Sequence, residues 1–526
     1  MTSAPSPPTA LYWQYLSGFY PNLPPEVLAS FTTCWEQTVW DDPQTPLDCN
    51  NLAVIALIEA EQAEGDLRAM GLEMALAALM QGVEMEPGHP LCVAHLALVR
   101  SLIGESEAAF QTAFPALIDL LQFAYTGEVF PLGLIYWPQG DYHLLADPTT
   151  IESIFAAATG ADQAMRLLAA VLCHCQLVFY GVSGKRFLQL AAQLMPNSAR
   201  FNLMLGLAHL MQQQWEGLLY LHQARTIAPE FAPAVQALYL AYRPLQPEVA
   251  DFWLHHAREL AEAQPQSLDW RWTSLDANST FTYLPFERTL LMAVEPNLRS
   301  IVTSVLLAEA DWFEAEMEFW REQLQPGMVV IDVGANVGVY TFSAAQKVGS
   351  NGRVLAVEPF SGCIRCLQET QRLNQLDWVT VCAGAASDHH GTSYLALQAA
   401  SELNEVISEI DPTLGEAFEA ITCFPLDSLI DSEGINRLDW LKIDAEGHEM
   451  QVLAGSDRLL TEFAPGIIYE NIAGDKGSNT EVAAYLQIKG YRLFRYQPYL
   501  KNLMPIESLE QLQGSLNIIA LPNQSG

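Results

Sequence analysis

Hydrophobic residues follow different periods in the two halves of the chain. Up to about residue 265, Ala- and Leu-rich amphipathic segments recur, and three of them end just before Pro196, Pro229 and Pro265. The separations of 33 and 36 residues bracket the period of about 34 residues found in paired-helix repeats. The pattern therefore predicts that residues 1–265 form an array of α-helical pairs.

Two further helix pairs are predicted nearer the N-terminus. They cover Asn51 to Glu86 and Leu91 to Leu121, and Gly104 lies at the turn of the second pair. A stretch rich in Pro, Gly and aromatic residues, near 126–150, interrupts the array. The region resembles tetratricopeptide repeats, which implies a surface for a partner or a long acceptor. A solenoid that serves only as a scaffold requires the same small and apolar positions, so both interpretations stay open.

From residue 327 to 526, short apolar runs alternate with helix-compatible segments. This alternation predicts an α/β domain with a doubly wound parallel sheet. The runs that predict its strands are 329–332, 354–358, 380–385, 440–444, 467–470, 491–495 and 516–521. Two additional strands, 392–397 and 421–426, are predicted to form a wall for the acceptor. Residues 266–326 are predicted to connect the two domains.

The first of these runs, from Met328, leads into a turn that contains Gly334 and Gly338. The order Gly334-x-Asn336-x-Gly338 lacks the G-x-G-x-x-G spacing of dinucleotide sites. Asp332, at the strand end, would repel a phosphate but suits the ammonium group of S-adenosylmethionine. Twenty residues after Gly338, Glu358 ends the next strand, where it can accept hydrogen bonds from both ribose hydroxyls.

The segment from about Gly327 to Pro522 resembles the FkbM family of S-adenosylmethionine-dependent methyltransferases. The residues that carry this resemblance are Ile331 to Gly338, Val357-Glu358-Pro359, Leu441 to Glu449, Val452 to Gly455 and Asn517 to Pro522. The resemblance implies a class I, Rossmann-like methyltransferase fold with a seven-stranded sheet whose last strand is antiparallel. It also implies O-methylation of a hydroxyl on a sugar, glycan or polyketide-like acceptor.

The chemistry is predicted to follow the fourth strand. Glu446 or His448 is the candidate base for the acceptor hydroxyl, Asp444 orients cofactor or acceptor, and Lys442 is expected to pair with a neighbouring carboxylate. No metal ligand is assigned, although Mg²⁺ held by Asp444, Glu446 and Glu470 remains an alternative.

Three other groups each have two possible roles. Asp388 is predicted to accept from the adenine amino group, unless it lies in an exposed turn with His389 and His390. The amide of Asn336 either contacts the cofactor or holds the glycine turn. In the helix predicted to open at Trp312, Glu314 or Glu316 either reaches the cofactor pocket or faces solvent.

Composition narrows the classes of partner and the compartment. The net charge of −36 argues against nucleic acid and anionic membranes. Nine scattered cysteines predict reduced thiols in a cytoplasmic protein, and Cys363 and Cys366 are expected in a helical core. The N-terminus has no secretory pattern, and the longest apolar stretch, Met165 to Val182, is interrupted by polar residues and does not predict a membrane span.

These patterns together predict a two-part enzyme, a helical repeat array followed by an FkbM-like O-methyltransferase. Two alternatives remain. In one, the repeats form an adaptor and the methyltransferase fold binds its cofactor without catalysis. In the other, the acceptor is a protein or a lipid held by the repeats.

Overall fold

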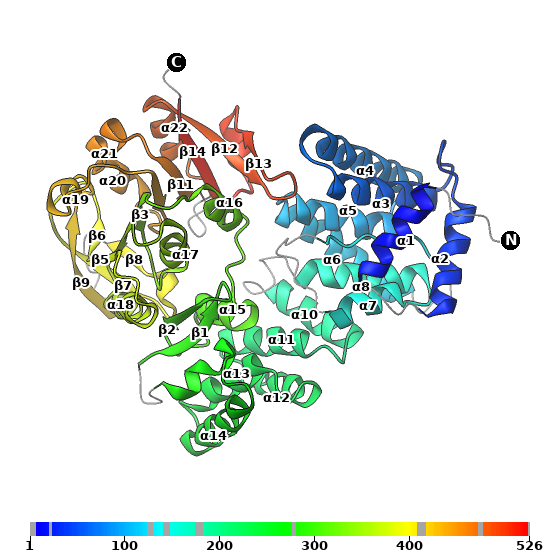
Figure 1. Cartoon of the computed structure of the whole chain (residues 1–526), viewed down its shortest axis with the longest axis horizontal. Coiled ribbons are helices and arrows are strands. Elements are labelled where there is room, and N and C mark those ends of the chain that lie inside the picture. Colours follow the sequence, from blue (N-terminus) through cyan, green and yellow to red (C-terminus); the bar gives the residue numbers. More distant parts are fainter. Residues whose placement is uncertain are drawn as a thin grey trace. The chain divides into compact units, whose positions relative to one another are not determined.

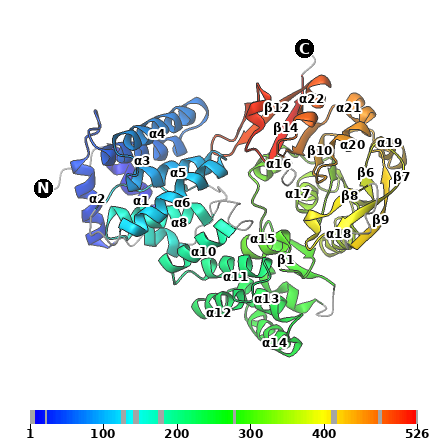
Figure 2. The same cartoon turned by 180° about the vertical axis from the view of Figure 1, so that it is seen from behind.

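The computed structural model describes residues 7–19, 24–123, 130–139, 148–173, 182–275, 280–407, 417–471 and 477–523. Contacts within the chain divide it into two compact units, residues 1–208 with 498–500, and residues 209–497 with 501–526. Figures 1 and 2 show the helices of the first unit in blue to cyan and the main sheet of the second in green to red. Many helices therefore precede an α/β domain, as the sequence predicts.

The first unit is helical throughout its regular elements. Its helices are α1 (Pro7–Phe19), α2 (Pro25–Gln37), α3 (Pro46–Gln62), α4 (Gly65–Met85), α5 (Pro90–Leu102), α6 (Ser106–Phe123), α7 (Pro148–Phe155), α8 (Gly160–Cys173), α10 (Val182–Leu194) and α11 (Ala199–Met211), the last of which runs on into the second unit. The predicted pairs correspond to α3 with α4 and α5 with α6. The start of α3 is fixed by a capping box between Thr45 and Asp48. The tetratricopeptide character of these pairs stays a prediction.

An extended segment, residues 130–139, lies buried within this helical unit. The side chains of residues 134–137 are at most 2% exposed. Their four backbone N–H groups donate to side chains of the surrounding helices, which are, in order, Asn51, Tyr12, His95 and Tyr15. Side chains thus replace the strand or helix partners that buried backbone requires. Residues 126–129 and 140–147 of the predicted interruption lie outside the described residues.

Replacing Asn51 with leucine is expected to destabilise the first unit by about 1–3 kcal/mol. Asn51 Oδ1 accepts from Leu134 N at 2.9 Å, and its Nδ2 donates to Thr38 Oγ1 at 2.8 Å. Leucine would leave the buried N–H of Leu134 without its acceptor. Denaturant unfolding measures the effect, with Gln14→Leu as an exposed control expected to change stability by less than about 0.5 kcal/mol. Equal stability of the two variants would contradict this role of Asn51.

The second unit begins with helices that the sequence assigns to the repeat array. It contains α12 (Gly217–Ile227), α13 (Ala232–Tyr242), α14 (Pro247–Ala263), η1 (Leu268–Ser274), a hairpin of β1 (Thr282–Phe286) and β2 (Leu290–Val294), α15 (Ile301–Glu309) and α16 (Glu316–Gln323). The Gln236 side chain of α13 donates to Thr282 Oγ1 and Tyr283 O of β1. Such contacts explain why α12–α14 cluster with the α/β part. The predicted domain bounds at 265 and 326 stay a prediction.

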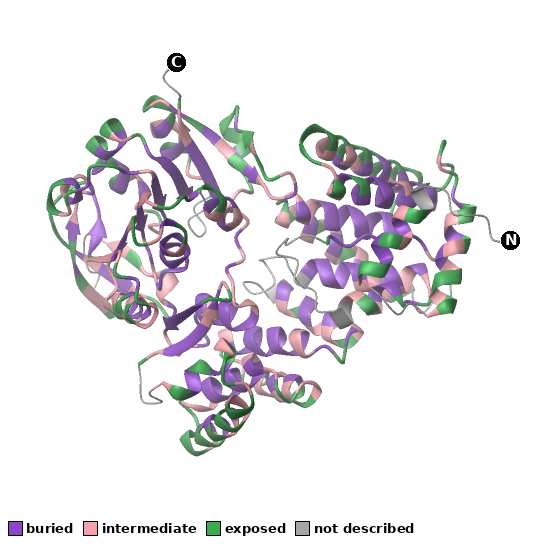
Figure 3. Cartoon of the chain, viewed as in Figure 1, coloured by how far each residue is buried: buried purple, intermediate pink, exposed green. Residues whose placement is uncertain are grey.

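The main sheet has eight strands in the order β13-β12-β14-β11-β10-β3-β4-β5. Their bounds are β3 (Val329–Val333), β4 (Arg353–Glu358), β5 (Val379–Ala383), β10 (Trp440–Ile443), β11 (Gly466–Glu470), β12 (Tyr491–Gln497), β13 (Asn502–Pro505) and β14 (Asn517–Pro522). Strands β5, β4, β3, β10 and β11 are parallel, whereas β14 and β12 are antiparallel to their neighbours. The central strands are buried, as their purple colour in Figure 3 shows, which fits their continuous apolar runs.

The predicted count of seven strands is wrong by one. The additional strand, β13, pairs with β12 at the edge of the sheet and is mostly exposed. Because an exposed edge strand needs no apolar face, its sequence carries no hydrophobic pattern that would reveal it. The antiparallel insertion of β14 between β11 and β12 agrees with the expectation from the resemblance.

Helices and a second sheet complete the α/β part. The helices are α17 (Val339–Val348), α18 (Ser361–Asn374), α19 (Asp427–Ser432), α20 (Glu449–Ala454), α21 (Asp457–Glu462) and α22 (Thr480–Ile488), with η2 (Ser401–Leu403) and η4 (Leu509–Leu512). The second sheet joins β6 (Ala385–Ala386), β9 (Ala417–Phe424), β7 (Gly391–Leu397) and β8 (Glu405–Ile407). The two predicted extra strands are β7 and β9, whereas β8 is too short to give a hydrophobic pattern.

The two cysteines that the sequence predicts in a helical core are found there. Cys363 and Cys366 are buried in α18, and the seven cysteines that can be described are free. None of the helices in the described ranges combines the length and apolar character needed to cross a membrane.

Candidate active site

The glycine turn lies between β3 and α17, beside the end of β10. Gly334 has a φ of 72°, and a Cβ atom there would lie 1.6 Å from the carbonyl oxygen of Asp444. Gly338 has a φ of 101°, and its Cβ would lie 2.5 Å from Phe342. Both positions therefore require glycine. Sheet order reverses between β3 and β10, and ligands of open α/β sheets bind at such a point.

Asn336 holds this turn through its own side chain. It adopts a left-handed conformation with a φ of 51°, and its Oδ1 accepts from Val337 N at 2.8 Å. Its backbone N–H donates to Glu358 Oε2 at 2.8 Å. Of the two roles left open by the sequence, turn stabilisation is the one with visible partners. A contact with the cofactor stays a prediction.

Glu358 is fixed at the end of β4 by two backbone donors. Its Oε2 accepts from Asn336 N and its Oε1 from Phe360 N, both at 2.8 Å. Each carboxylate oxygen keeps a second lone pair, so Glu358 retains the acceptor capacity for the two predicted ribose contacts. Burial raises the pKa of this carboxyl to about 7.

Affinity for S-adenosylmethionine is expected to rise with pH through about 7. The ionised form of Glu358 accepts from ribose hydroxyls as well as from its two backbone donors, whereas protonation removes acceptor capacity. Below the pKa, one required deprotonation costs about tenfold in affinity per pH unit. Calorimetry from pH 6 to 8 measures this dependence, and Glu358→Gln should weaken it. The same slope in that variant would show that another group is responsible.

Asp332 is enclosed by the protein. Only 2% of the residue is exposed, and its Oδ2 accepts from Thr341 Oγ1 of α17 at 2.5 Å. Burial raises the pKa of Asp332 to about 6. The partners that can be seen tie the strand to the first helix. The predicted contact between Asp332 and the cofactor is not tested by these contacts.

Lys442 provides a buried positive charge beneath the site. The residue is 1% exposed, its Nζ lies 2.9 Å from Asp444 Oδ2, and it also lies 4.7 Å from the ring centroid of Tyr340. Burial lowers the pKa of Lys442, but the charges of Asp444, Glu314 and Asp332 raise it overall. The pairing of Lys442 with a carboxylate that the sequence predicts is therefore present.

Glu314 is also part of this buried network. Its Oε2 accepts from Tyr340 Oη at 2.6 Å and from Asn517 Nδ2 at 2.9 Å. The predicted helix begins at Glu316, so Glu314 precedes it. Burial and the charge of Glu314 raise the pKa of Glu316 to about 7. Glu314 therefore does not face solvent, and Trp312 and Trp320 are buried core residues.

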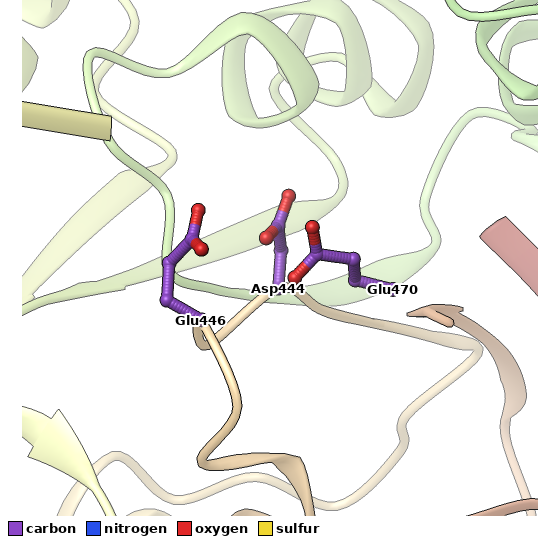
Figure 4. Close-up of side chains that lie close together, drawn as sticks. All are labelled: Asp444, Glu446 and Glu470. Atoms are coloured by element: carbon purple, nitrogen blue, oxygen red, sulfur yellow. The ribbon is translucent and has the colours of Figure 1, made fainter. Parts of the chain in front are cut away.

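Three carboxylates converge at the ends of β10 and β11. Asp444, Glu446 and Glu470 each offer an oxygen atom, and these atoms lie within 4.8 Å of one another. Figure 4 shows the three side chains directed to the same side of the loop. Burial and repulsion by Asp444 raise the pKa of the carboxyls of Glu446 and Glu470. The sequence assignment left Glu470 out of the catalytic set, although its place at a strand end signalled it.

The loop that presents Glu446 is held by a residue that the sequence assignment missed. Glu446 and Gly447 have φ angles of 50° and 91°. Glu449 is 1% exposed, and its Oε1 accepts from Ala445 N at 3.1 Å and from Gly447 N at 3.0 Å. Its Oε2 accepts from Asn479 Nδ2 at 3.1 Å. Glu449 is thus a positioning residue. Its place three residues after Glu446 is the feature of the sequence that could have indicated this role.

His448 and Asp388 interact with side chains outside the group of Asp444, Glu446 and Glu470. The Nε2 atom of His448 lies 3.1 Å from Ser387 Oγ, and burial lowers the pKa of this histidine. The side chain of Asp388 is 51% exposed and lies 2.7 Å from His389 Nδ1. This arrangement is that of an exposed turn, while the predicted contact of Asp388 with adenine stays a prediction.

The sheet order, the glycine turn and the acidic strand ends define the C-terminal part as a methyltransferase-type α/β domain. Residues 332–493 match the model of the methyltransferase FkbM domain. The chain thus contains an FkbM methyltransferase domain, and this family implies the use of S-adenosylmethionine.

Individual similar proteins cover parts of the chain. Methyltransferase sdnD from Sordaria araneosa is 25% identical over 195 residues, which are 32% of this chain and 74% of that protein. A crystal structure of Methyltransferase FkbM from Methylobacillus flagellatus is 17% identical with a TM-score of 0.26, and covers 41% of this chain and 53% of that one. A crystal structure of Precorrin-6y C5,15-methyltransferase from Geobacter metallireducens is 13% identical with a TM-score of 0.24. The match covers 39% of this chain and 86% of that one.

Proposed function

We propose that the protein transfers the methyl group of S-adenosylmethionine to a hydroxyl oxygen of a sugar, glycan or polyketide-like acceptor. The observation that carries the proposal is the convergence of Asp444 and Glu446 beside the glycine turn. This arrangement puts carboxylates next to the turn at which the cofactor is expected to bind.

Glu446 is the proposed base. The acceptor oxygen bonds to the methyl carbon, the carbon–sulfur bond breaks with its electron pair on sulfur, and the hydroxyl proton passes to Glu446. Burial and repulsion by Asp444 raise the pKa of Glu446, which makes its carboxylate a stronger base. The positive sulfonium group of the cofactor favours the ionised form that accepts the proton.

Asp444 is proposed to orient the reactants. Its Oδ2 is paired with Lys442, and its carbonyl oxygen contacts the glycine turn. A group held in this way can fix the approach of acceptor and methyl group, and alignment supplies much of the rate of a displacement reaction.

The second sheet is proposed to form one wall of the acceptor site. The charge of Glu405 on β8 is one of those that raise the pKa of Glu446, after burial, Asp444 and Glu449. The charge of this strand therefore acts on the proposed base, and we propose that the sheet contacts the acceptor. Glu402, in the short helix η2 between β7 and β8, is not available to an acceptor, because it accepts from Ser300 Oγ and Ile301 N at the start of α15.

A screen with labelled methyl groups tests this function. The full chain, labelled S-adenosylmethionine and a panel of sugars, glycans and polyketide-like alcohols should give a product with the label on oxygen. Cofactor binding without transfer to any hydroxyl acceptor would contradict the proposal. Transfer to a protein or a lipid would move the acceptor to that class, with the helical unit as its predicted binding surface.

A further inference from the structure

We propose that Asp444, Glu446 and Glu470 bind one divalent cation at the ends of β10 and β11. Each residue offers one carboxylate oxygen, and the three oxygens lie within 4.8 Å of one another (Figure 4). This geometry suits a single small ion that is shared by all three groups.

The sheet itself forces two of these carboxylates together. Ile443 of β10 is in register with Tyr469 of β11, so Asp444 and Glu470 follow at equivalent positions on adjacent parallel strands. Residues at equivalent positions point to the same face of a sheet. Like charges side by side destabilise the folded chain, and a bound cation would offset this repulsion.

Neighbouring positive charge does not balance the cluster. Among the described residues, the basic group paired with these carboxylates is Lys442, which binds Asp444 Oδ2 and lies over Tyr340. One positive charge therefore faces three carboxylates. The remaining negative charge matches that of a divalent cation.

A second observation comes from Glu470 alone. Its Oε2 atom is buried and has no hydrogen-bond partner among the residues that the structure describes. A buried carboxylate oxygen without a partner is costly, and coordination to a cation would satisfy it.

The donor set indicates the kind of ion. Three carboxylate oxygens without sulfur or imidazole suit hard cations, Mg²⁺, Mn²⁺ or Ca²⁺. Three protein oxygens leave coordination positions for water or for the acceptor. In the part of this inference that rests on the proposed function, the cation would polarise the acceptor hydroxyl, while the second oxygen of Glu446 stays available for the proton.

Titration of the full chain with Mn²⁺ tests the site. The concentration of free Mn²⁺ is monitored by its electron paramagnetic resonance signal. We expect one specific site per chain, with an affinity at least tenfold weaker in Glu470→Gln and in Glu446→Gln. Glu481→Gln, at an exposed position on α22, is the matched control and should bind as the unchanged protein does.

S-adenosylmethionine binding, measured in parallel, separates this inference from the proposed function. Glu470→Gln should keep its affinity for the cofactor, because Glu470 is not among the predicted cofactor contacts. Absence of a specific Mn²⁺ site, or equal Mn²⁺ affinity in all the variants, would overturn the inference even where the cofactor still binds. Equal affinity in all the variants would mean that Mn²⁺ binds to many acidic groups on the surface and not to these three carboxylates.

Discussion

Glu446→Gln is expected to lower the rate of methyl transfer by about 10²- to 10⁴-fold, the range of a general base in contact with its proton. Glutamine keeps the size of the side chain but cannot accept the hydroxyl proton. Affinity for S-adenosylmethionine should stay nearly unchanged, because the predicted cofactor contacts come from β3, β4, the loops that follow them and Asp388, and do not include Glu446. Single-turnover transfer and calorimetry measure the two quantities.

Glu481→Gln provides the matched control for this change, because it removes an exposed carboxylate of the same domain. It should transfer methyl groups as the unchanged protein does. If Glu446→Gln kept normal turnover, the assignment of the base would be wrong, and His448 would be the next residue to change.

Gly334→Ala is expected to weaken S-adenosylmethionine binding and to lower the rate of methyl transfer by at least about 100-fold, since a misplacement of reacting groups by about 1 Å can cost this much in rate. The new Cβ would lie 1.6 Å from the carbonyl oxygen of Asp444, which is backbone and can move only with the end of β10. The substitution would therefore separate the cofactor turn from the catalytic loop. Calorimetry with the cofactor measures the loss.

Gly434→Ala separates this contact from simple backbone strain. Gly434 also has a positive φ, 63°, but an added Cβ would have no atom within 4 Å. Its cost should be limited to the roughly 1–2 kcal/mol of a left-handed residue, without loss of cofactor affinity. Equal cofactor affinity in the two variants would show that the close approach of Gly334 to Asp444 does not shape the site.

The sequence predicted the central strands well because both faces of a parallel strand are buried. Val329 to Val333 and Trp440 to Ile443 are continuous apolar runs apart from Asp332 and Lys442. Both polar residues are buried, and they lie opposite one another on adjacent strands. The exceptions to the pattern therefore marked the site, whereas the exposed strand β13 left no pattern to find.

Side-chain partners were harder to predict than strands. The buried N–H groups of the extended segment at residues 130–139 find their acceptors on Asn51, His95 and two tyrosines. These four side chains come from three different helices. Glu314 lies in a buried network with Tyr340 and Asn517, which is 203 residues away in the sequence. Such contacts depend on tertiary packing, which local patterns do not contain.

For the candidate site, the sequence predicted which residues lie there better than it predicted what each of them does. It placed Asp444 and Glu446 beside the glycine turn, because strand ends of a parallel sheet meet at one edge. It grouped Glu470 with them only as an alternative magnesium site, because the closeness of the three depends on the register of β10 and β11. It could not show that Glu449 holds the loop through two backbone N–H groups.

Calorimetric titration of the full chain with S-adenosylmethionine tests the central claim most directly, because it requires no knowledge of the acceptor. The account predicts one binding site, competition by S-adenosylhomocysteine, and no competition by nicotinamide or flavin dinucleotides. Absence of binding, or preferential binding of a dinucleotide, would contradict the claim that the turn from Gly334 to Gly338 holds the methyl donor.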